Sequence, residues 1–343
     1  MLNLRNFLTL PLVVTLAAIS AEAGANTLIN GAGATFPQPI YSKWFAEYAS
    51  VNKAASINYQ AIGSGGGIRQ LIQGTVDFGA TDEPMSAEEA GKVKTPVLHV
   101  PTVLGAVAVS YNVPGVKSLN LTGEMVAEIF MGTIKKWNDP KIVAANKDAK
   151  LPDLAIVPTY RSDGSGTTAV FTDYLVKASK GFEIKVGKGK AVMWPAGIGA
   201  KGNAGVAGVI AQNPGAVGYV ELVFAATNNL AVASIQNKSG EFVAPSTASV
   251  SAAATGRVPE MLKNDFKVSI TDPTTKGAYP ISSFTWLLIP NEMSKVKGSA
   301  MIAFVDWALG ATGQKMAADL NYAPLPKELA TEVVARVKKL QLK

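Results

Sequence analysis

The residues best suited to chemistry lie within residues 159–168, where a guanidinium is followed by a carboxylate, two glycines and several hydroxyl groups. Arg161 carries a planar fork of N–H donors that suits an oxyanion, and Asp163 is placed to neutralise and orient it. Ser165 and Thr167 add hydroxyl donors. An ordinary capped helix uses the same residue types, because Asp-Gly-Ser-Gly is common turn chemistry. This stretch by itself leaves both interpretations open.

Three predicted helix starts in this chain carry glycine together with a hydroxyl residue. Apolar residues 154–157 predict a strand before the first of them, and the spacing of residues 169–175 predicts a helix after it. Glycine turns at residues 63–67 and 31–36 also stand between a predicted strand and a predicted helix. The first N–H groups of a helix lack internal partners and carry partial positive charge. Three such starts predict a convergent cradle for an oxyanion.

The first 25 residues have the pattern of a cleavable secretory signal peptide. Arg5 precedes an apolar run over residues 7–19, and small residues follow, so that cleavage is expected after Ala23 or Ala25. A membrane helix needs about 20 apolar residues, and this run is shorter. The chain has no cysteine, so it has neither a disulfide nor a thiol for a lipid anchor. We therefore expect a protein exported in soluble form to the periplasm.

The formal net charge of +7 has two readings, since it can keep the protein soluble or help to attract anions. Basic residues are scattered over the chain, and aromatic residues do not alternate with them in a stripe. Nucleic acid is therefore not an expected partner. The length of 343 residues exceeds one typical domain of about 100–200 residues, so the chain can form more than one lobe.

Strand and helix patterns alternate along the chain, which predicts a doubly wound α/β sheet. No internal repeat or low-complexity linker interrupts them, so we expect two lobes between which the chain crosses more than once. Residues 181–203 predict a long irregular connection, with Asn203 as the cap of the helix that follows, and residues 225–275 give weak signals. The predicted strands are residues 28–32, 57–62, 76–80, 97–100, 104–111, 154–157, 217–222 and 281–290. The predicted helices are residues 39–49, 68–73, 123–130, 169–179, 206–212, 301–308 and 328–340.

Ordered motifs over nearly the whole chain resemble the substrate-binding proteins of high-affinity phosphate ABC transporters. The motifs are residues 31–37, 63–64, 76–82, 134–137, 161–167, 199–203, 215–221, 304–307 and 322–326. The resemblance implies an α/β fold of the type II periplasmic-binding-protein kind, in which two lobes, each a mixed sheet flanked by helices, enclose a ligand cleft. After the signal peptide (residues 1–25), it implies a discontinuous lobe 1 of residues 26–103 and 281–343, and a lobe 2 of residues 104–280. The implied hinges are near residues 101–105 and 279–284.

The resemblance also implies the residues that contact phosphate. Two neighbouring positions depart from some family members, because Tyr160 stands where these have a second arginine and Gly65 where they have a second serine. The implied contacts are Thr35, Phe36, Ser64, Asp82, Arg161, Ser165, Gly166 and Thr167, with Asp163 paired to the arginine. The implied function is to capture inorganic phosphate in the periplasm and deliver it to an inner-membrane ABC permease and its ATPase. The expected protein is a monomer without cofactor, metal or enzymatic activity.

An enzyme is the first alternative, and the residue inventory disfavours it. A Ser-His-Asp hydrolase needs a histidine, and His99 is the only one. His99 lies in an apolar strand pattern, where a core or hinge role is expected. Ser165 stands between glycines, but the Gly-x-Ser-x-Gly nucleophile motif is not formed there. The chain also lacks a nucleotide P-loop and any cluster of histidine and cysteine that would hold a transition metal.

Two further alternatives keep the fold and change its use. The ligand can be sulfate, molybdate or an organic phosphate, or the protein can be a surface interaction protein without a transport role. Asp82 is relevant to the choice of ligand, because a carboxylate repels an oxyanion unless the oxyanion donates a proton to the carboxylate. Phosphate carries a P–OH near neutral pH and sulfate does not, so Asp82 is either a filter against sulfate or only a cap of its turn.

Overall fold

The computed structural model describes residues 27–343, and the predicted signal peptide lies outside them. The strands are β1 (Thr27–Gly33), β2 (Ala55–Ala61), β3 (Phe78–Thr81), β4 (Val97–Tyr111), β5 (Asn120–Leu121), β6 (Val157–Arg161), β7 (Ile198–Ala200), β8 (Ala216–Glu221), β9 (Ala231–Val232), β10 (Ser234–Gln236), β11 (Phe242–Val243), β12 (Ser282–Pro290), β13 (Glu292–Met293) and β14 (Gln341–Leu342). The helices are α1 (Gln38–Val51), α2 (Ser64–Gln73), α3 (Ala87–Gly91), α4 (Gly123–Phe130), α5 (Pro140–Ala145), α6 (Gly166–Ala178), α7 (Lys180–Lys185), α8 (Gly202–Gln212), α9 (Leu222–Thr227), α10 (Thr247–Ala254), α11 (Val258–Lys263), α12 (Lys295–Leu309), α13 (Ala311–Asp319) and α14 (Lys327–Val337).

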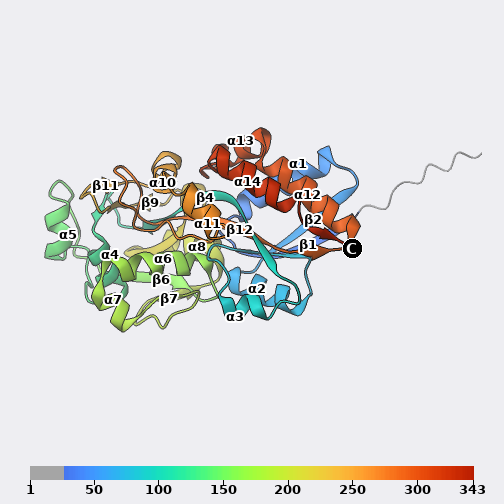
Figure 1. Cartoon of the computed structure of the whole chain (residues 1–343). Helices are drawn as coiled ribbons and strands as arrows, with labels where there is room; N and C mark the ends of the chain where they lie inside the picture. Colours follow the sequence, from blue (N-terminus) through green and yellow to red (C-terminus); the bar gives the residue numbers. More distant parts are fainter. Residues whose placement is uncertain (1–26) are drawn as a thin grey trace, which may run out of the picture.

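The main element is a mixed sheet that runs the length of the molecule (Figure 1). Its strand order is β2-β1-β3-β12-β4-β8-β6-β7, with β9 paired to β4. The outer strands on each side pair in parallel, whereas β12 and β4 run antiparallel to their neighbours and to each other. We call the β2-β1-β3-β12 part with its helices lobe 1 and the β8-β6-β7 part with its helices lobe 2. The predicted two-lobed α/β fold is confirmed.

Strand β4 belongs to both lobes. Val97–Ala106 pair with β12, and Val107–Tyr111 pair with β8. The strand is buried from residue 99 to its end, as its nearly continuous apolar sequence indicates. The sequence predicted two strands bent across Pro101. The structure has one strand, and the bend appears only as a shift of register opposite Thr285 and Trp286, where proline cannot donate to the ladder.

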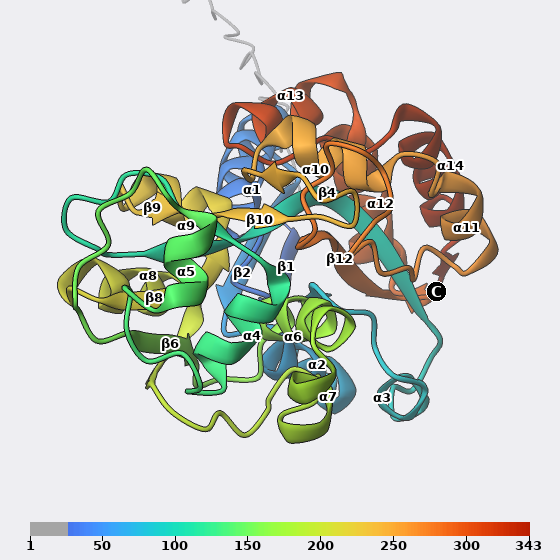
Figure 2. The ribbon, with the colours of Figure 1, turned by 90° about the vertical axis from the view of Figure 1, so that its left-hand side faces the viewer.

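Lobe 1 is built from both ends of the chain. Helices α1, α12, α13 and α14 cover one side of its sheet, and α2 and α3 cover the other (Figure 1). The ends meet in the core, where Nε1 of Trp44 donates a hydrogen bond to the carbonyl of Gly313 at 2.8 Å. Phe45 and Phe304 add a ring contact at 5.1 Å. Helix α11 also packs against α14 (Figure 2). The predicted residue boundaries of the two lobes stay a prediction.

Lobe 2 is contiguous in sequence around its sheet. Helices α6 and α8 both pack on β8, and α4 and α7 pack on α6. Phe171 of α6 stacks on Tyr219 of β8 with ring centroids 4.2 Å apart. A small sheet in the order β11-β10-β5 belongs to the same lobe. None of the helices within residues 27–343 combines the length and apolarity that a bilayer crossing requires.

Two local predictions were wrong. The stretch 181–203 is not wholly irregular, because it contains most of α7, the strand β7 and the start of α8. β7 is a short edge strand of three mostly exposed residues, so it carries no alternation of apolar side chains. Asn203 does not cap a helix, since α8 begins at Gly202 and places Asn203 in its first turn. The weak stretch 225–275 contains short elements, among them α10 and α11.

Candidate functional site

Polar groups from both lobes meet at the start of α6. Ser64, at the start of α2, accepts hydrogen bonds at its Oγ from the backbone N–H of Gly166 at 3.1 Å and of Asp82 at 3.4 Å. Gly166 has no space for a side chain, because a Cβ there would lie 2.5 Å from Oγ of Ser64 and 2.6 Å from Oδ2 of Asp82. The first turn of a lobe 2 helix therefore touches the polar groups of lobe 1 directly.

Arg161 ends β6, and its side chain is 1% exposed. Its Nε and Nη2 donate to the two carboxylate oxygens of Asp163 at 2.7 and 2.6 Å, and Nη1 donates to Oγ1 of Thr167 at 3.4 Å. Its backbone N–H donates to the hydroxyl of Tyr219 at 3.1 Å. A guanidinium has five N–H groups, so one on each Nη remains for another acceptor.

Asp163 is held in its ionised form. Burial alone would raise the pKa of this carboxyl, but the hydrogen bonds and charge of Arg161 outweigh burial and keep the pKa below its ordinary value. The N–H of Gly202 also donates to its Oδ1 at 3.0 Å. The predicted pairing of Asp163 with Arg161 is therefore formed, and it fixes the orientation of the guanidinium.

Asp82 is a buried carboxylate, 2% exposed, at the end of β3. Burial raises its pKa to about 7, although a hydrogen bond from Oγ1 of Thr285 to Oδ1 at 2.8 Å and the charge of Arg161 both act to lower the pKa. The turn that follows is held by Thr81, whose Oγ1 donates to the carbonyl of Glu83 and accepts from its N–H. The hydrogen bonds of Thr81 therefore hold that turn without the carboxylate of Asp82.

Thr35 and Thr167 come from different lobes and share one partner, Asn203. The Oγ1 of Thr35 accepts from the backbone N–H of Asn203 at 3.2 Å and from its Nδ2 at 2.8 Å. The Oγ1 of Thr167 accepts from the same Nδ2 at 3.1 Å. All three residues are buried. Asn203 thus ties the turn after β1 to the first turn of α6.

Ser165 and Phe36 complete the predicted set. The Oγ of Ser165 caps α6 by accepting from the N–H of Thr168 at 3.0 Å, and a hydroxyl in this role still has its own hydrogen to donate. The ring of Phe36 is fully buried, and its carbonyl accepts from the hydroxyl of Tyr322 at 2.7 Å. Phe36 therefore has its backbone N–H, rather than its side chain, to offer to a polar ligand.

The two lobes touch around these groups. The N–H of Gly65 donates to the carbonyl of Gly164 across the boundary at 2.9 Å. Gly63 has a positive φ of 89°, and a Cβ there would overlap the carboxylate of Asp163. Lys190 of lobe 2 pairs with Glu89 of lobe 1 at 3.1 Å. The structure is therefore that of a closed cleft.

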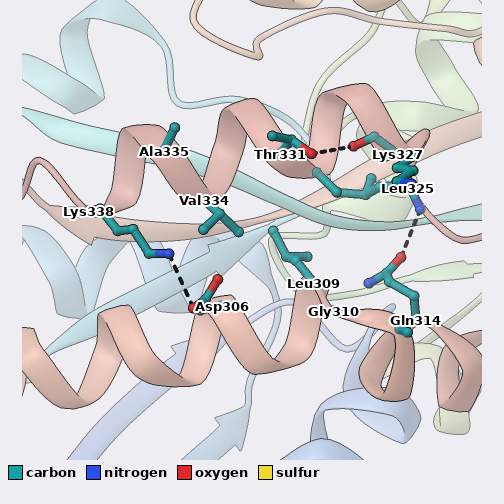
Figure 3. A pocket seen from close by; sticks show the side chains of 12 residues that line it. Asp306, Leu309, Gly310, Gln314, Leu325, Lys327, Thr331, Val334, Ala335 and Lys338 are labelled. Carbon is teal, nitrogen blue, oxygen red and sulfur yellow. Dashed lines mark hydrogen bonds and ion pairs between the residues drawn. The ribbon is translucent and has the colours of Figure 1, made fainter.

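Small cavities flank the group of buried polar residues. One of about 210 Å³ lies on the side of Thr35, Gln38 and Asn203, and another of about 240 Å³ lies beside Asp82 and Ser283. A larger cavity of about 610 Å³ lies elsewhere, between α12, α13 and α14 (Figure 3). Its lining contains none of the predicted site residues, and two of its charged residues, Asp306 and Lys338, are paired with each other. The small cavities, rather than the large one, belong to the predicted site.

His99 has no part in this arrangement. It is buried at 3% exposure, and its Nε2 accepts from the backbone N–H of Met85 at 3.0 Å, which confirms the predicted core role. Burial, followed by the charge of Lys267, lowers its pKa to about 4. Within residues 27–343, no group of three or more His, Cys, Asp or Glu side chains has a metal-binding arrangement.

The sequence did not reveal all the residues around this group. Thr285, which donates to Asp82, and Tyr219, which supports Arg161, lie inside strand patterns that indicate only burial. Asn203 lies in a motif that the sequence singled out, but its expected role was a helix cap. Pairing between residues far apart in the sequence, within a lobe or across the two lobes, leaves no periodic signal, so contacts of this kind appear only in the structure.

A family model and the sequences of related proteins place this chain among known binding proteins. Residues 20–312 match the family model described as a PBP superfamily domain. The chain is 42% identical over 321 residues to the phosphate-binding protein PstS of Xylella fastidiosa, covering 92% of this chain and 86% of that protein. It is 42% identical over 319 residues to PstS of Haemophilus influenzae, covering 92% and 94%.

Solved structures agree on the fold. A high-affinity periplasmic phosphate-binding protein, PfluDING, determined with bound phosphate, superimposes with a TM-score of 0.72 at 23% identity, covering 90% of this chain and 93% of that chain. An ABC-type phosphate transport receptor from Vibrio cholerae superimposes with a TM-score of 0.57 at 17% identity, covering 87% and 100%. At this level of identity the likeness concerns the fold.

Proposed function

This chain belongs to the PstS family of phosphate-binding proteins within the PBP superfamily, and on that premise we propose that its phosphate site is the buried polar group between the lobes. The protein captures inorganic phosphate for ABC-type import. The proposed contacts are Thr35, Phe36, Ser64, Asp82, Arg161, Ser165, Gly166 and Thr167, with Asp163 behind the arginine.

The observation that supports this site best is the balance of hydrogen-bond donors and acceptors. Arg161 is 4% exposed and has two N–H groups left beyond those that hold Asp163 and Thr167. Hydroxyl groups of both lobes and the positive end of α6 surround it. A closed cleft of this composition stabilises an anion, because its donors are oriented and shielded from water once the lobes have closed over the ligand.

Asp82 supplies the acceptor that phosphate needs. Phosphate carries at least one P–OH near neutral pH, and Oδ1 of Asp82 is already occupied by Thr285, so Oδ2 is the oxygen next to Gly166 and the cleft. A P–OH that donates to this oxygen forms a short, charge-assisted hydrogen bond. Sulfate has no such proton and meets a carboxylate lone pair instead. Sites that require a ligand hydroxyl can reject analogues without it by roughly 10⁴–10⁵.

The finer parts of the transport function are part of the same proposal. We infer binding without turnover, in a periplasmic monomer that hands phosphate to an inner-membrane permease and its ATPase. We also propose that the lobes comprise residues 26–103 with 281–343, and residues 104–280. Strand β4 pairs with β12 of lobe 1 and then with β8 of lobe 2, which supports a hinge at the first of those boundaries.

Calorimetry tests the proposal directly. After treatment with EDTA, the purified protein should bind one inorganic phosphate per chain. Loss of binding in EDTA, or steady release of phosphate from a phosphate ester, would contradict binding without metal and without turnover. Competition by sulfate, molybdate and an organic phosphate in the same experiment separates the alternative ligands, and a surface interaction protein without a transport role would retain no phosphate after dialysis.

A further inference from the structure

Asn203 lies at the centre of the hydrogen bonds between the lobes and is completely buried. Its backbone N–H and its Nδ2 both donate to Oγ1 of Thr35, and Nδ2 also donates to Oγ1 of Thr167. Its Oδ1 accepts from the backbone N–H of Glu221 at 2.9 Å. A backbone N–H can only donate, so the side-chain atom that faces Glu221 must be the oxygen. The amide therefore has one possible orientation, with its NH2 group toward the two threonines.

This orientation determines what the threonine hydroxyls can do. A hydroxyl oxygen has two lone pairs and one hydrogen. Both lone pairs of Thr35 receive hydrogen bonds from Asn203, at 3.2 and 2.8 Å. Thr167 receives one from Asn203 at 3.1 Å and one from Nη1 of Arg161 at 3.4 Å. Neither the amide NH2 group nor a guanidinium can accept, so each threonine hydrogen must point to some other acceptor.

We infer that Asn203 is a positioning residue that fixes the hydroxyls of Thr35 and Thr167 as donors to the bound anion. The inference rests on the proposed function and adds a residue to it. Free hydroxyls can turn to accept or to donate, and a hydroxyl that accepts would repel an oxyanion. Asn203 removes that freedom for one threonine of each lobe at the same time.

The same arrangement narrows the choice of acceptor for the protonated oxygen of phosphate. Ser64 is also fixed as a donor, because its Oγ accepts from the N–H groups of Gly166 and Asp82. With these three hydroxyls unable to accept, Asp82 and the second lone pair of Ser165 are the acceptors left among the proposed contacts, and the carboxylate is the stronger of the two. Asn203 therefore affects the selectivity for phosphate by orienting the hydroxyls of Thr35 and Thr167. The Ser64 hydroxyl, which is oriented by backbone groups, does not depend on it.

The test uses Asn203→Asp and Asn203→Ala in the full mature protein, with inorganic phosphate as the probe in calorimetry. Aspartate keeps an oxygen for the N–H of Glu221 but replaces the NH2 donor by an acceptor, which turns the threonine hydrogens toward itself. We expect Asn203→Ala to weaken binding by about 10- to 100-fold and Asn203→Asp by more than about 100-fold. Gln38→Glu is the matched control for added charge, because Gln38 lines the same small cavity and bonds Thr35 through its backbone N–H rather than its side chain.

A second arm separates positioning from a merely structural role. In a protein that carries Thr35→Val and Thr167→Val, the hydroxyls are gone, so Asn203→Ala should cost less than about threefold in affinity. An equal loss in both backgrounds overturns the inference, as does near-normal binding by Asn203→Asp. Failure of both Asn203 variants to fold also overturns it, since Asn203 would then be structural. Absence of phosphate binding in the unmodified protein contradicts the proposed function instead.

Discussion

Lys190 links the start of α6 to the opposite lobe. Its backbone carbonyl accepts the N–H of Ser165 at 2.8 Å, and its Nζ lies 3.1 Å from Oε2 of Glu89 in α3 and 3.3 Å from Oε2 of Glu83. The lysine and the two glutamates belong to different lobes. This ion pair therefore forms only when the lobes come together, and it acts on the closed state alone.

Removing this ion pair should speed the release of phosphate. The side chains of Lys190 and Glu89 are 17% and 28% exposed, so solvent screens them and the pair is worth roughly 0.5–1 kcal/mol. We expect Lys190→Met to raise the dissociation rate about two- to fivefold in stopped-flow measurements. Lys141→Met is the control, because Lys141 pairs with Glu128 within lobe 2 and its other charged neighbours also belong to that lobe. Equal effects of the two substitutions would contradict a role in closure.

Arg161 should dominate the affinity. It is the buried positive charge of the proposed site, and leaving an oxyanion in a closed cleft without its partner costs roughly 3–5 kcal/mol. Arg161→Ala should weaken phosphate binding by orders of magnitude in calorimetry, and Arg161→Lys should restore little, because lysine lacks the fork that reaches both Asp163 and the ligand. Near-normal affinity in the alanine variant would place the site elsewhere. Circular dichroism and melting curves check that each variant keeps its fold.

Asp82→Asn should relax the discrimination between phosphate and sulfate. An amide in place of the carboxylate can turn its NH2 group toward an unprotonated oxyanion, so the repulsion of sulfate disappears. Excess sulfate should then displace labelled phosphate from the variant and not from the unmodified protein. Thr81 already holds the turn, so the melting temperature should change little. Unchanged selectivity with a lowered melting temperature would make Asp82 a turn residue only.

The ligand-free protein should open as the pH rises through about 7. Burial in the closed cleft raises the pKa of Asp82 to about 7. Opening the cleft admits water to the carboxyl and lowers its pKa, so the closed form is favoured while the carboxyl is protonated and disfavoured once it ionises. Small-angle scattering without phosphate at pH 5 and pH 8 should show the more compact form at pH 5.

Asp82→Asn provides the control for that experiment. Asparagine does not titrate, so most of the difference in compactness between the two pH values should be lost in this variant. Phosphate added at pH 8 should restore the compact form of the unmodified protein, because its P–OH replaces the missing proton. A compactness that is the same at both pH values would show that closure does not depend on this carboxyl.

The alternation of strands and helices predicted the α/β architecture, and the glycine turns predicted which helix starts meet. Arg161 and Ser64 enter the proposed site because a charged fork and hydroxyls beside glycine have a recognisable chemistry. The hydrogen bond from Thr285 to Asp82 joins residues 203 positions apart, and nothing in the pattern of β12 marks this threonine from its buried neighbours. The sequence predicts Asn203 to be a cap, because asparagine before a helix is among the preferred N-cap residues.

The hydrogen bond between Trp44 and Gly313 implies an order in which the two lobes fold. These residues are 269 positions apart, so α1 cannot complete its packing until the last helices have been made and have left the ribosome or the export channel. Contacts of such long range slow folding, because the chain between them must be closed into a loop first. The strands β6, β7 and β8 of lobe 2 come from residues 157–221 and need no such delay. A chain emerging from its N-terminus should therefore fold its second lobe first and keep its first lobe open until the C-terminus arrives.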